Sequence, residues 1–251
     1  MTDIILCGAN GRMGKFITEA VSKRDDIRIV AGVDLNTESS AGFPVFATIS
    51  EVLTPADVIV DFSNPALLDS ILDYVKEKNM PAVLATTGYS AEATAKIKKA
   101  AEVSPIFFTF NMSLGVNLLV SLSKKAAEVL GDAFDVEIVE KHHNQKLDAP
   151  SGTAVMLANA INEVYGGDMA YEFDRHSKRE KRPQKQIGIH SIRGGNIVGE
   201  HDVIFAGHDE VITLSHHASS REVFALGAVK AALFMKGKAS GLYDMNDVIT
   251  L

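Results

Sequence analysis

The chain has 251 residues, of which 46% are hydrophobic and 23% charged, and its formal net charge is −7. This length can bury one large core or two modest ones, and the composition is that of an ordinary globular protein. The acidic balance argues against nonspecific binding to nucleic acid, and no apolar stretch approaches the roughly 20 residues that span a bilayer.

The single cysteine and the first residues bear on location. Cys7 cannot form an internal disulfide, and it lies in an apolar run where a buried, unreactive thiol is expected. The segment MTDIILCGANG enters a strand with no basic residues ahead of it, so no signal peptide is expected there. A cytoplasmic location is therefore the expectation.

The first half of the sequence predicts an alternation of short strands and helices. The expected strands are rich in apolar and β-branched residues and lie at 4–7, 28–34, 57–62, 81–85 and 106–109. The expected helices lie at 11–24, after the cap and proline of Ser63-Asn64-Pro65, and at 91–103. Near-continuous apolar strands separated by helices indicate a parallel sheet that is covered on both faces.

After Asn111 the pattern changes. Helices are expected at 113–131 and 151–165, and the alternating segment at 134–138 suits a strand with one wet or partner-covered face. Strands are expected at 188–193, 202–206 and 210–215, and we predict that these neighbours are antiparallel. A last helix at 222–235 is expected to carry four apolar side chains inward: Phe224, Leu226, Val229 and Leu233.

A glycine-rich segment, GANGRMG at 8–14, joins the first expected strand to the first expected helix. Its glycines let the backbone approach a pyrophosphate closely, and the helix start offers N–H groups and a positive dipole. Asp34 ends the second strand, where a carboxylate can bind an adenosine ribose. The spacing is a GxxGxxG variant, so it predicts a dinucleotide site only together with its βαβ context. A nucleoside-triphosphate loop is rejected, because Ala9 and Phe16 replace residues that it requires.

The charge around Asp34 bears on which dinucleotide is used. The segment 29–75 contains no Lys or Arg, so a 2′-phosphate would meet a carboxylate with no local cation except Arg12 of the loop. The sequence therefore predicts NADH as the preferred cofactor, with NADPH the poorer one.

The segment EKHHNQKLDAPSGTA, at 140–154, combines two histidines and a lysine with a proline and a helix start. Lys146 offers a positive charge, and His142 and His143 can hold or release a proton near neutral pH. Adjacent side chains of a regular strand point to opposite faces, so either one histidine faces a ligand or both turn into a cleft at the strand's end. The run at 151–153 is either a simple N-cap or a site for a carboxylate.

Metal binding is not expected. The adjacent histidines lack the i, i+4 helical spacing of zinc enzymes, and His201, His208, His216 and His217 show no metal-ligand spacing either.

The segment at 140–154 closely resembles a motif of the dihydrodipicolinate reductase family, the 4-hydroxy-tetrahydrodipicolinate reductases of the diaminopimelate–lysine pathway. The similarity continues, in order along almost the whole chain, in GANGRMG, ATTGYS, TFNMSLGVN, IRGGNIVGEH and SREVFALGA. It implies an α/β fold, with a Rossmann-type doubly wound parallel sheet domain at 1–112 and 220–251. It also implies a smaller α+β domain with a mixed sheet at 113–219, which binds the cyclic dicarboxylate substrate and forms a homotetramer.

The resemblance implies roles for individual residues. His142 would be the acid and Lys146 the proton donor in a reaction that transfers hydride from NADH or NADPH. The substrate would be bound by His143, Lys146, Ser151, Gly152 and Thr153. The cofactor would be bound by Gly8, Ala9, Asn10, Gly11, Arg12, Met13, Asp34, Ala85, Thr86, Thr87, Gly88, Thr109, Phe110, Asn111 and Met112. The segment after Asp34 lacks an arginine that some relatives carry, which agrees with the cofactor prediction.

Two other functions are compatible with the nucleotide loop alone. A protein that senses NADH without turnover would have the same loop, but no reason to keep His142, Lys146 and 151–153 together. The other is a related dehydrogenase that acts on an amino acid or an aldehyde. The aldehyde route would need a nucleophilic cysteine, and Cys7 in the first strand is badly placed for that role.

Overall fold

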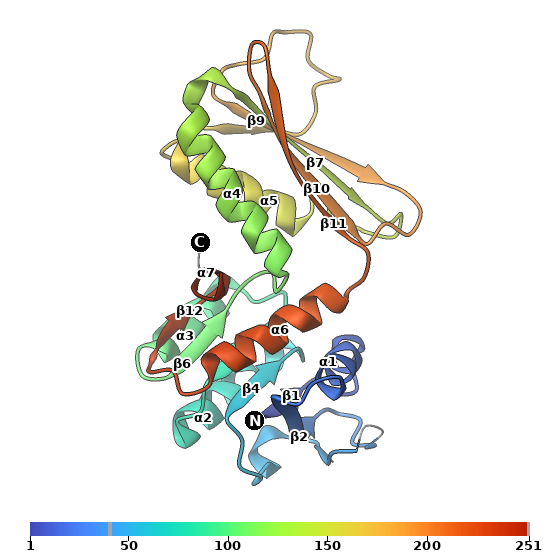
Figure 1. Cartoon of the computed structure of the whole chain (residues 1–251), viewed down its shortest axis with the longest axis vertical. Coiled ribbons are helices and arrows are strands. Elements are labelled where there is room, and N and C mark those ends of the chain that lie inside the picture. The colour runs from blue at the N-terminus through green and yellow to red at the C-terminus, as the bar shows by residue number, and fades with distance from the viewer. Residues whose placement is uncertain (40–41, 250–251) are drawn as a thin grey trace. The chain divides into compact units, whose positions relative to one another are not determined.

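The computed structural model describes residues 1–39 and 42–249 (Figure 1). The chain forms two compact units: unit 1 comprises Met1–Leu114 and Arg221–Leu251, and unit 2 comprises Gly115–Ser220. Unit 1 is therefore built from two separate stretches of sequence. No helix among the described residues is both long and apolar enough to cross a membrane.

Unit 1 contains a seven-stranded parallel sheet. Its strands are β1 (Thr2–Cys7), β2 (Ile27–Val33), β3 (Val45–Phe46), β4 (Val58–Asp61), β5 (Ala82–Leu84), β6 (Pro105–Phe108) and β12 (Gly241–Tyr243). They lie in the order β12-β6-β5-β4-β1-β2-β3. The chain moves outward from β1 in one direction and from β4 in the other, so the order reverses between these two strands. Open α/β sheets bind ligands at such a switch point, beyond the carboxyl ends of the strands.

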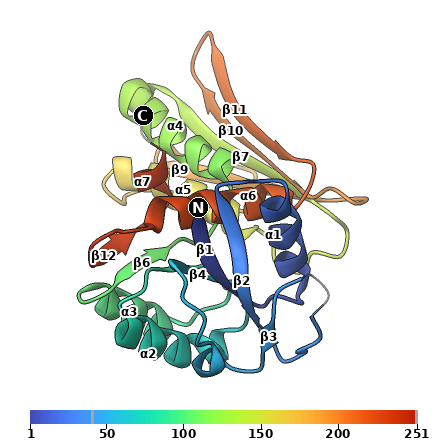
Figure 2. The ribbon, with the colours of Figure 1, turned by 60° about the horizontal axis from the view of Figure 1, so that its bottom comes forward.

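Helices cover both faces of this sheet (Figure 2). Helices α1 (Arg12–Ser22) and α6 (Glu222–Met235) pack on one face, and α2 (Leu68–Lys78) and α3 (Ala91–Ala101) pack on the other. Three short helical segments complete the unit: η1 (Ile49–Glu51), η2 (Pro65–Leu67) and α7 (Met245–Val248). The predicted cap and proline hold, because the Asn64 side chain accepts the N–H of Ala66 at the start of η2.

Helix α6 packs through its small residues. Ala225, Ala228, Ala231 and Ala232 are fully buried, whereas Leu226 is 44% exposed. A Cβ at Gly227 would lie 1.7 Å from the carbonyl oxygen of Met112, so only glycine allows this close approach. The expectation that Leu226 points inward is therefore wrong, and Phe224 and Leu233 are only partly buried. The helix approaches its neighbours too closely for large side chains to fill the contact.

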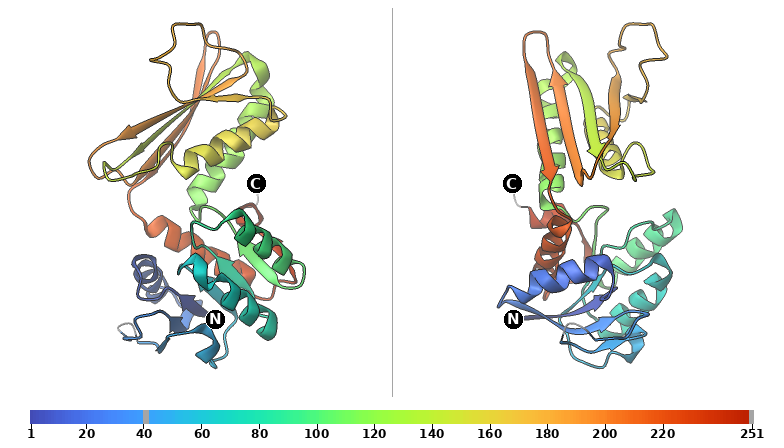
Figure 3. Two further views of the ribbon diagram at one scale, coloured as in Figure 1. Left: turned by 180° about the vertical axis from the view of Figure 1, so that it is seen from behind. Right: turned by 90° about the vertical axis from the view of Figure 1, so that its right-hand side faces the viewer.

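Unit 2 contains a five-stranded mixed sheet (Figure 3). Its strands are β7 (Asp135–His142), β8 (Ala170–Glu172), β9 (Gln186–Arg193), β10 (Gly199–Ala206) and β11 (Val211–Ala218), in the order β11-β10-β7-β9-β8. Helices α4 (Leu114–Leu130) and α5 (Gly152–Val164) pack against the buried side chains of the sheet, and η3 (Gly131–Ala133) follows α4. Strand β7 is central, so its end is held between β10 and β9.

The predicted fold class, a doubly wound parallel sheet unit with a smaller unit containing a mixed sheet, is confirmed. The prediction of antiparallel neighbours is correct for β10 and β11. It is wrong for β9, which pairs in parallel with β7 instead of lying beside β10. The strand expected at 134–138 continues to His142, which places the first histidine of the motif on the strand itself.

Candidate functional site

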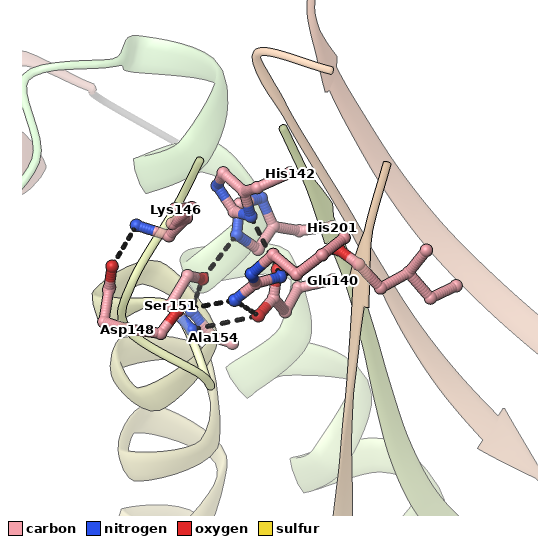
Figure 4. Close-up of polar contacts among 9 residues, drawn as sticks. Glu140, His142, Lys146, Asp148, Ser151, Ala154 and His201 are labelled. Carbon is pink, nitrogen blue, oxygen red and sulfur yellow. Dashed lines mark hydrogen bonds and ion pairs between the residues drawn. The ribbon is translucent and has the colours of Figure 1, made fainter. Parts of the chain in front are cut away.

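The first candidate site lies in unit 2, at the end of β7 (Figure 4). Burial alternates along this strand, and Glu140 and His142 lie on the same buried face as Val136 and Ile138. Glu140 has no exposed surface. A charged group in such a position is costly unless it is paired and hydrogen-bonded, so the partners of Glu140 define the site.

Donors from three elements surround the Glu140 carboxylate. Arg193, at the end of β9, donates from Nη1 to Oε2 at 2.8 Å and from Nη2 to Oε1 at 2.7 Å. The Nδ1 atom of His142 lies 2.6 Å from Oε2. The backbone N–H of Ser151 donates to Oε1 at 3.1 Å. One carboxylate thus joins β7, β9 and the start of α5.

The electrostatics follow from burial and these partners. Burial acts to raise the pKa of Glu140, but hydrogen bonds from Arg193, Ser191 and His142 outweigh it and lower the pKa to about 2. Glu140 is therefore ionised at neutral pH. Burial lowers the pKa of His142 below the ordinary histidine value, and the charge of Glu140 opposes this shift.

The two adjacent histidines have different surroundings. His142 is buried, and its ring packs edge-on against that of His201 on β10, with the ring centroids 5.2 Å apart. His143 follows the end of β7 and is half-buried. Burial lowers the pKa of His201 to about 4, so this third histidine is neutral at neutral pH.

The loop after β7 holds Lys146. Its backbone N–H donates to the carbonyl of His143 at 3.1 Å, and its ammonium lies 2.8 Å from Oδ1 of Asp148. Arg193 Nη2 also donates to the carbonyl oxygen of Asp148 at 2.6 Å. The guanidinium that pairs with Glu140 therefore also fixes the loop that carries the lysine.

Helix α5 begins where this loop ends. The Ser151 hydroxyl accepts the N–H of Ala154 at 3.1 Å and lies 3.0 Å from Nε2 of His201. Ser151 is buried and acts as an N-cap here, so its role in binding substrate stays a prediction. Gly152 is exposed, and nothing lies within 4 Å of the place where its Cβ would stand. An anionic group can approach the helix start closely at Gly152.

The second candidate site lies in unit 1, where GANGRMG joins β1 to α1. Gly8 has a φ of 79°, and a Cβ there would lie 2.6 Å from the carbonyl oxygen of Phe62. A Cβ at Gly14 would lie 2.3 Å from the carbonyl oxygens of Gly8 and Ala9. Among the described residues, no side chain caps α1 at Gly11. The loop is a tight, uncapped cradle at a helix start, and this geometry fits a pyrophosphate.

Asp34 lies directly beside this cradle. Its Oδ2 accepts the N–H of Asn10 at 3.0 Å, and its Oδ1 accepts the N–H of Asn36 at 3.1 Å. Each carboxylate oxygen has two lone pairs, so both can still accept a hydroxyl hydrogen. The position and chemistry of Asp34 therefore fit a ribose diol.

A cavity of about 330 Å³ opens beyond the carboxyl ends of β4, β5 and β6. It is lined by Met13, Phe62, Ser63, Ala85, Thr86, Thr87, Thr109, Phe110, Asn111, Met112 and Phe224. Of the predicted cofactor residues at 85–88 and 109–112, all except Gly88 are in this set. Gly88 instead has a φ of 85° and turns the chain after Thr87.

A buried carboxylate, Asp61, supports one side of this cavity. It accepts the N–H of Ser63 at 3.1 Å, the hydroxyl of Thr86 at 2.8 Å and that of Tyr89 at 3.1 Å. Burial raises its pKa, and these hydrogen bonds oppose the shift. Asp61 thus ties the loops after β4 and β5 together behind the cavity wall.

Replacing Asp61 with asparagine is expected to weaken NADH binding about tenfold or more, since hydrogen bonds to a charged group contribute about 1.5–3 kcal/mol. Fluorescence titration with NADH measures the effect. Asp69→Asn, on the exposed surface of α2, is the matched control and should bind normally. Unchanged affinity in Asp61→Asn would show that the cavity wall does not depend on this carboxylate.

Neither the motifs nor the resemblance predicted a role for Glu140, Arg193 or Asp61, and His201 was considered only as a metal ligand. Glu140 and Arg193 lie in segments that resemble the family, but they are far apart in sequence. The parallel pairing of β7 with β9 places Arg193 beside His142, and this register brings Arg193 close to Glu140. For Asp61, the available signal in the sequence was its position directly after a run of apolar residues.

Comparison with known proteins places the whole chain in one family. Residues 2–112 match the profile described as dihydrodipicolinate reductase, N-terminus, and residues 115–249 match the corresponding C-terminus profile. The 4-hydroxy-tetrahydrodipicolinate reductase of Clostridium novyi is 49% identical over 249 residues, which cover 99% of this chain and 98% of the relative. The enzyme of the same name from Clostridium tetani is 50% identical over 246 residues, covering 98% and 96%.

Solved structures are also similar to this chain. A dipicolinate-bound dihydrodipicolinate reductase from Paenisporosarcina sp. TG-14 superposes with a TM-score of 0.82 at 26% identity, covering 99% of this chain and all of the other. An aspartate dehydrogenase from Thermotoga maritima reaches a TM-score of 0.53 at 14% identity over 95% of this chain, a similarity of fold alone.

Proposed function

This chain belongs to the dihydrodipicolinate reductase family, and from that premise we propose that it reduces 4-hydroxy-tetrahydrodipicolinate to tetrahydrodipicolinate with a nicotinamide cofactor. The observation that carries the proposal is the cluster at the end of β7. A buried Glu140–Arg193 pair holds His142, and the same Arg193 fixes the loop of Lys146 beside the start of α5. A protein that only senses NADH has no need of such a cluster.

The substrate is a ring with two carboxylates, which calls for two anion-binding groups. We assign one to the start of α5, where Gly152 is open and the helix dipole favours negative charge. We assign the other to Lys146 and His143. Ser151 supports the helix start as its cap, and Thr153 completes the predicted set.

A bound reduced nicotinamide supplies the hydride. The substrate's hydroxyl and a ring hydrogen leave as water, the hydride adds to the unsaturated ring that results, and one proton adds to the electron-rich site that the hydride creates. The protein orients the ring and delivers that proton. Lys146 carries three N–H donors on a tethered ammonium, and we assign it that delivery. His142 is the acid of the reaction in the proposal. The relative solved with dipicolinate, a pyridine dicarboxylate, supports a ligand of this class.

Gly8–Met13 is proposed to hold the pyrophosphate, Asp34 the ribose, and the residues of the 330 Å³ cavity the nicotinamide. We further propose that unit 2 forms the interface of a homotetramer, and that the enzyme works in the cytoplasm. Analytical ultracentrifugation tests the tetramer directly, and a monomer at micromolar concentration would contradict it.

NADH is expected to be the better cofactor. Asp34 lies beside the glycine-rich loop, where its carboxylate accepts the N–H of Asn10, and the segment 29–75 contains no Lys or Arg to pair with a 2′-phosphate. The measurement is kcat/KM with each cofactor at saturating substrate. A tenfold or greater advantage for NADPH would refute the preference.

The activity is tested by following loss of nicotinamide absorbance with enzymatically generated 4-hydroxy-tetrahydrodipicolinate. We expect oxidation of NADH that depends on both enzyme and substrate. Binding of NADH without turnover would favour the sensor, and turnover only with an amino acid or an aldehyde would favour a related dehydrogenase.

A further inference from the structure

A continuous chain of polar contacts in unit 2 connects the two groups that the proposed function gives to proton delivery. It runs from His142 to Glu140 at 2.6 Å, and from Glu140 to Arg193 at 2.7 and 2.8 Å. It continues from Arg193 to the Asp148 carbonyl at 2.6 Å, and from the Asp148 carboxylate to Lys146 at 2.8 Å. Figure 4 shows the two ends of this chain, Lys146 and His142, above Ser151.

We propose that Glu140 and Arg193 are positioning residues for the reaction. The Glu140 carboxylate keeps a hydrogen on Nδ1 of His142, so that Nε2 is the ring atom that releases and regains the proton. Arg193 keeps Glu140 ionised and holds the Lys146 loop in place. The identity of the reaction rests on the proposed function. Which ring nitrogen of His142 carries the hydrogen does not.

The hydrogen-bonding partners of Glu140 determine the tautomer of His142. An ionised carboxylate has no hydrogen to donate, so a contact of 2.6 Å between it and an imidazole nitrogen requires that the nitrogen carry the hydrogen. Both oxygens of Glu140 also accept from Arg193, and Oε1 accepts from the backbone of Ser151. These partners can only donate, so the oxygens that face them must act as acceptors, and the carboxylate carries no hydrogen of its own.

The space around Nε2 supports the same assignment. A Cβ at Gly199 would lie 3.1 Å from Nε2 of His142 and 3.6 Å from Cδ2, so glycine at this position keeps that edge of the ring free of a side chain. His201 packs against the ring edge-on and directs its own Nε2 to Ser151. Neither neighbour therefore occupies the Nε2 edge in the way that Glu140 occupies Nδ1.

The charged and titratable groups that face His142 are Glu140 on the same strand, Arg193 on β9, Lys146 in the following loop and His201 on β10. Among these, only Glu140 favours the protonated imidazole. Removing its charge lowers the pKa of His142 further, so less of the acid form remains at neutral pH. The decline of activity with rising pH should therefore move to lower pH.

The first test uses the wild-type protein without substrate or cofactor. Proton-detected ¹⁵N spectra of the histidine rings, assigned with His142→Asn, report which ring nitrogen carries the hydrogen. We expect neutral His142 to show a protonated Nδ1 and an unprotonated Nε2. A neutral ring with its hydrogen on Nε2 would overturn the inference, whether or not the protein reduces the proposed substrate.

The second test uses Glu140→Gln. We expect a mixture of His142 tautomers, turnover at least about tenfold lower near pH 8, and a smaller deficit near pH 6, because the acid form is partly restored there. A uniform loss at all pH values with an unchanged tautomer would reduce Glu140 to a structural residue and overturn the proposal.

The Arg193→Lys variant keeps the positive charge. It should retain the Nδ1–H tautomer of His142 while turnover falls, since one ammonium cannot replace the guanidinium that binds both Glu140 and the Asp148 carbonyl.

The two tests separate the inference from the function. If reduction of the proposed substrate fails while Nδ1 of His142 carries the hydrogen, the proposed function falls and the positioning by Glu140 stands. If reduction succeeds with the hydrogen on Nε2, the function stands and the positioning falls.

Discussion

Replacing Lys146 with alanine is expected to lower turnover by about 100-fold or more while leaving NADH affinity nearly unchanged. The ammonium is proposed both to hold a substrate carboxylate and to deliver the proton, and preorganised charge at a reacting centre is typically worth about 10²–10³ in rate. The nucleotide cradle lies in the other unit of the chain, so cofactor binding should not depend on this side chain. Steady-state kinetics and a fluorescence titration with NADH measure the two effects.

The neighbouring Leu147 offers the matched control. Its side chain is 99% exposed and follows Lys146 in the same loop, so Leu147→Ala perturbs the loop without removing a charge. It should keep nearly full activity. Asp148→Asn is informative as well, because it removes the anion that anchors the ammonium at 2.8 Å but leaves the lysine in place. A fully active Lys146→Ala protein would refute the assignment.

The second large effect is expected at His142. Positioned acids and bases typically contribute about 10²–10⁴ in rate, so loss of this ring should lower turnover by that order and change substrate affinity much less. Alanine would also leave Glu140 short of a donor in a buried site, which destabilises the fold. His142→Asn is the sharper variant, because the amide can still donate to Glu140 although the Nε2 atom is gone.

The measurement is kcat and KM for the substrate, with thermal unfolding as the check on folding. We expect His142→Asn to unfold close to the wild-type temperature and to lose activity through kcat. A loss confined to KM would make His142 a binding residue. Normal activity would remove it from the reaction and leave Lys146 as the sole proton donor of the proposal.

Much of the fold was predictable because the signals were local. The alternation of apolar strands and helices up to 109, the cap at Asn64 and the helix at 222–235 each depend on residues close together in sequence. The strands β3, β8 and β12 were missed because each has only two or three residues, too few to show a period. The inward face of α6 was predicted wrongly because a contact built on alanine and glycine carries no large apolar stripe.

The candidate site was also predictable only where its residues are close together in the sequence. GANGRMG and the segment at 140–154 show their chemistry as contiguous runs, so the sequence could identify them. The pairing of Glu140 with Arg193 joins residues 53 positions apart, and it depends on β9 lying beside β7 rather than next to its sequence neighbour β10. Asp61 was hidden for a related reason: its partners Thr86 and Tyr89 follow a different strand, and its apolar surroundings resemble an ordinary buried strand.

The two-part construction of unit 1 has a consequence for biosynthesis. Helix α6 and strand β12 follow unit 2 in the sequence, yet α6 covers one face of the parallel sheet and β12 pairs with β6. As the polypeptide leaves the ribosome, β6 therefore stays an open edge, and an apolar face stays bare, until all of unit 2 has been translated. Exposed edges and faces of this kind invite aggregation, so the nascent chain is most vulnerable, and most in need of chaperones, while unit 2 is being translated and α6 and β12 have not yet emerged.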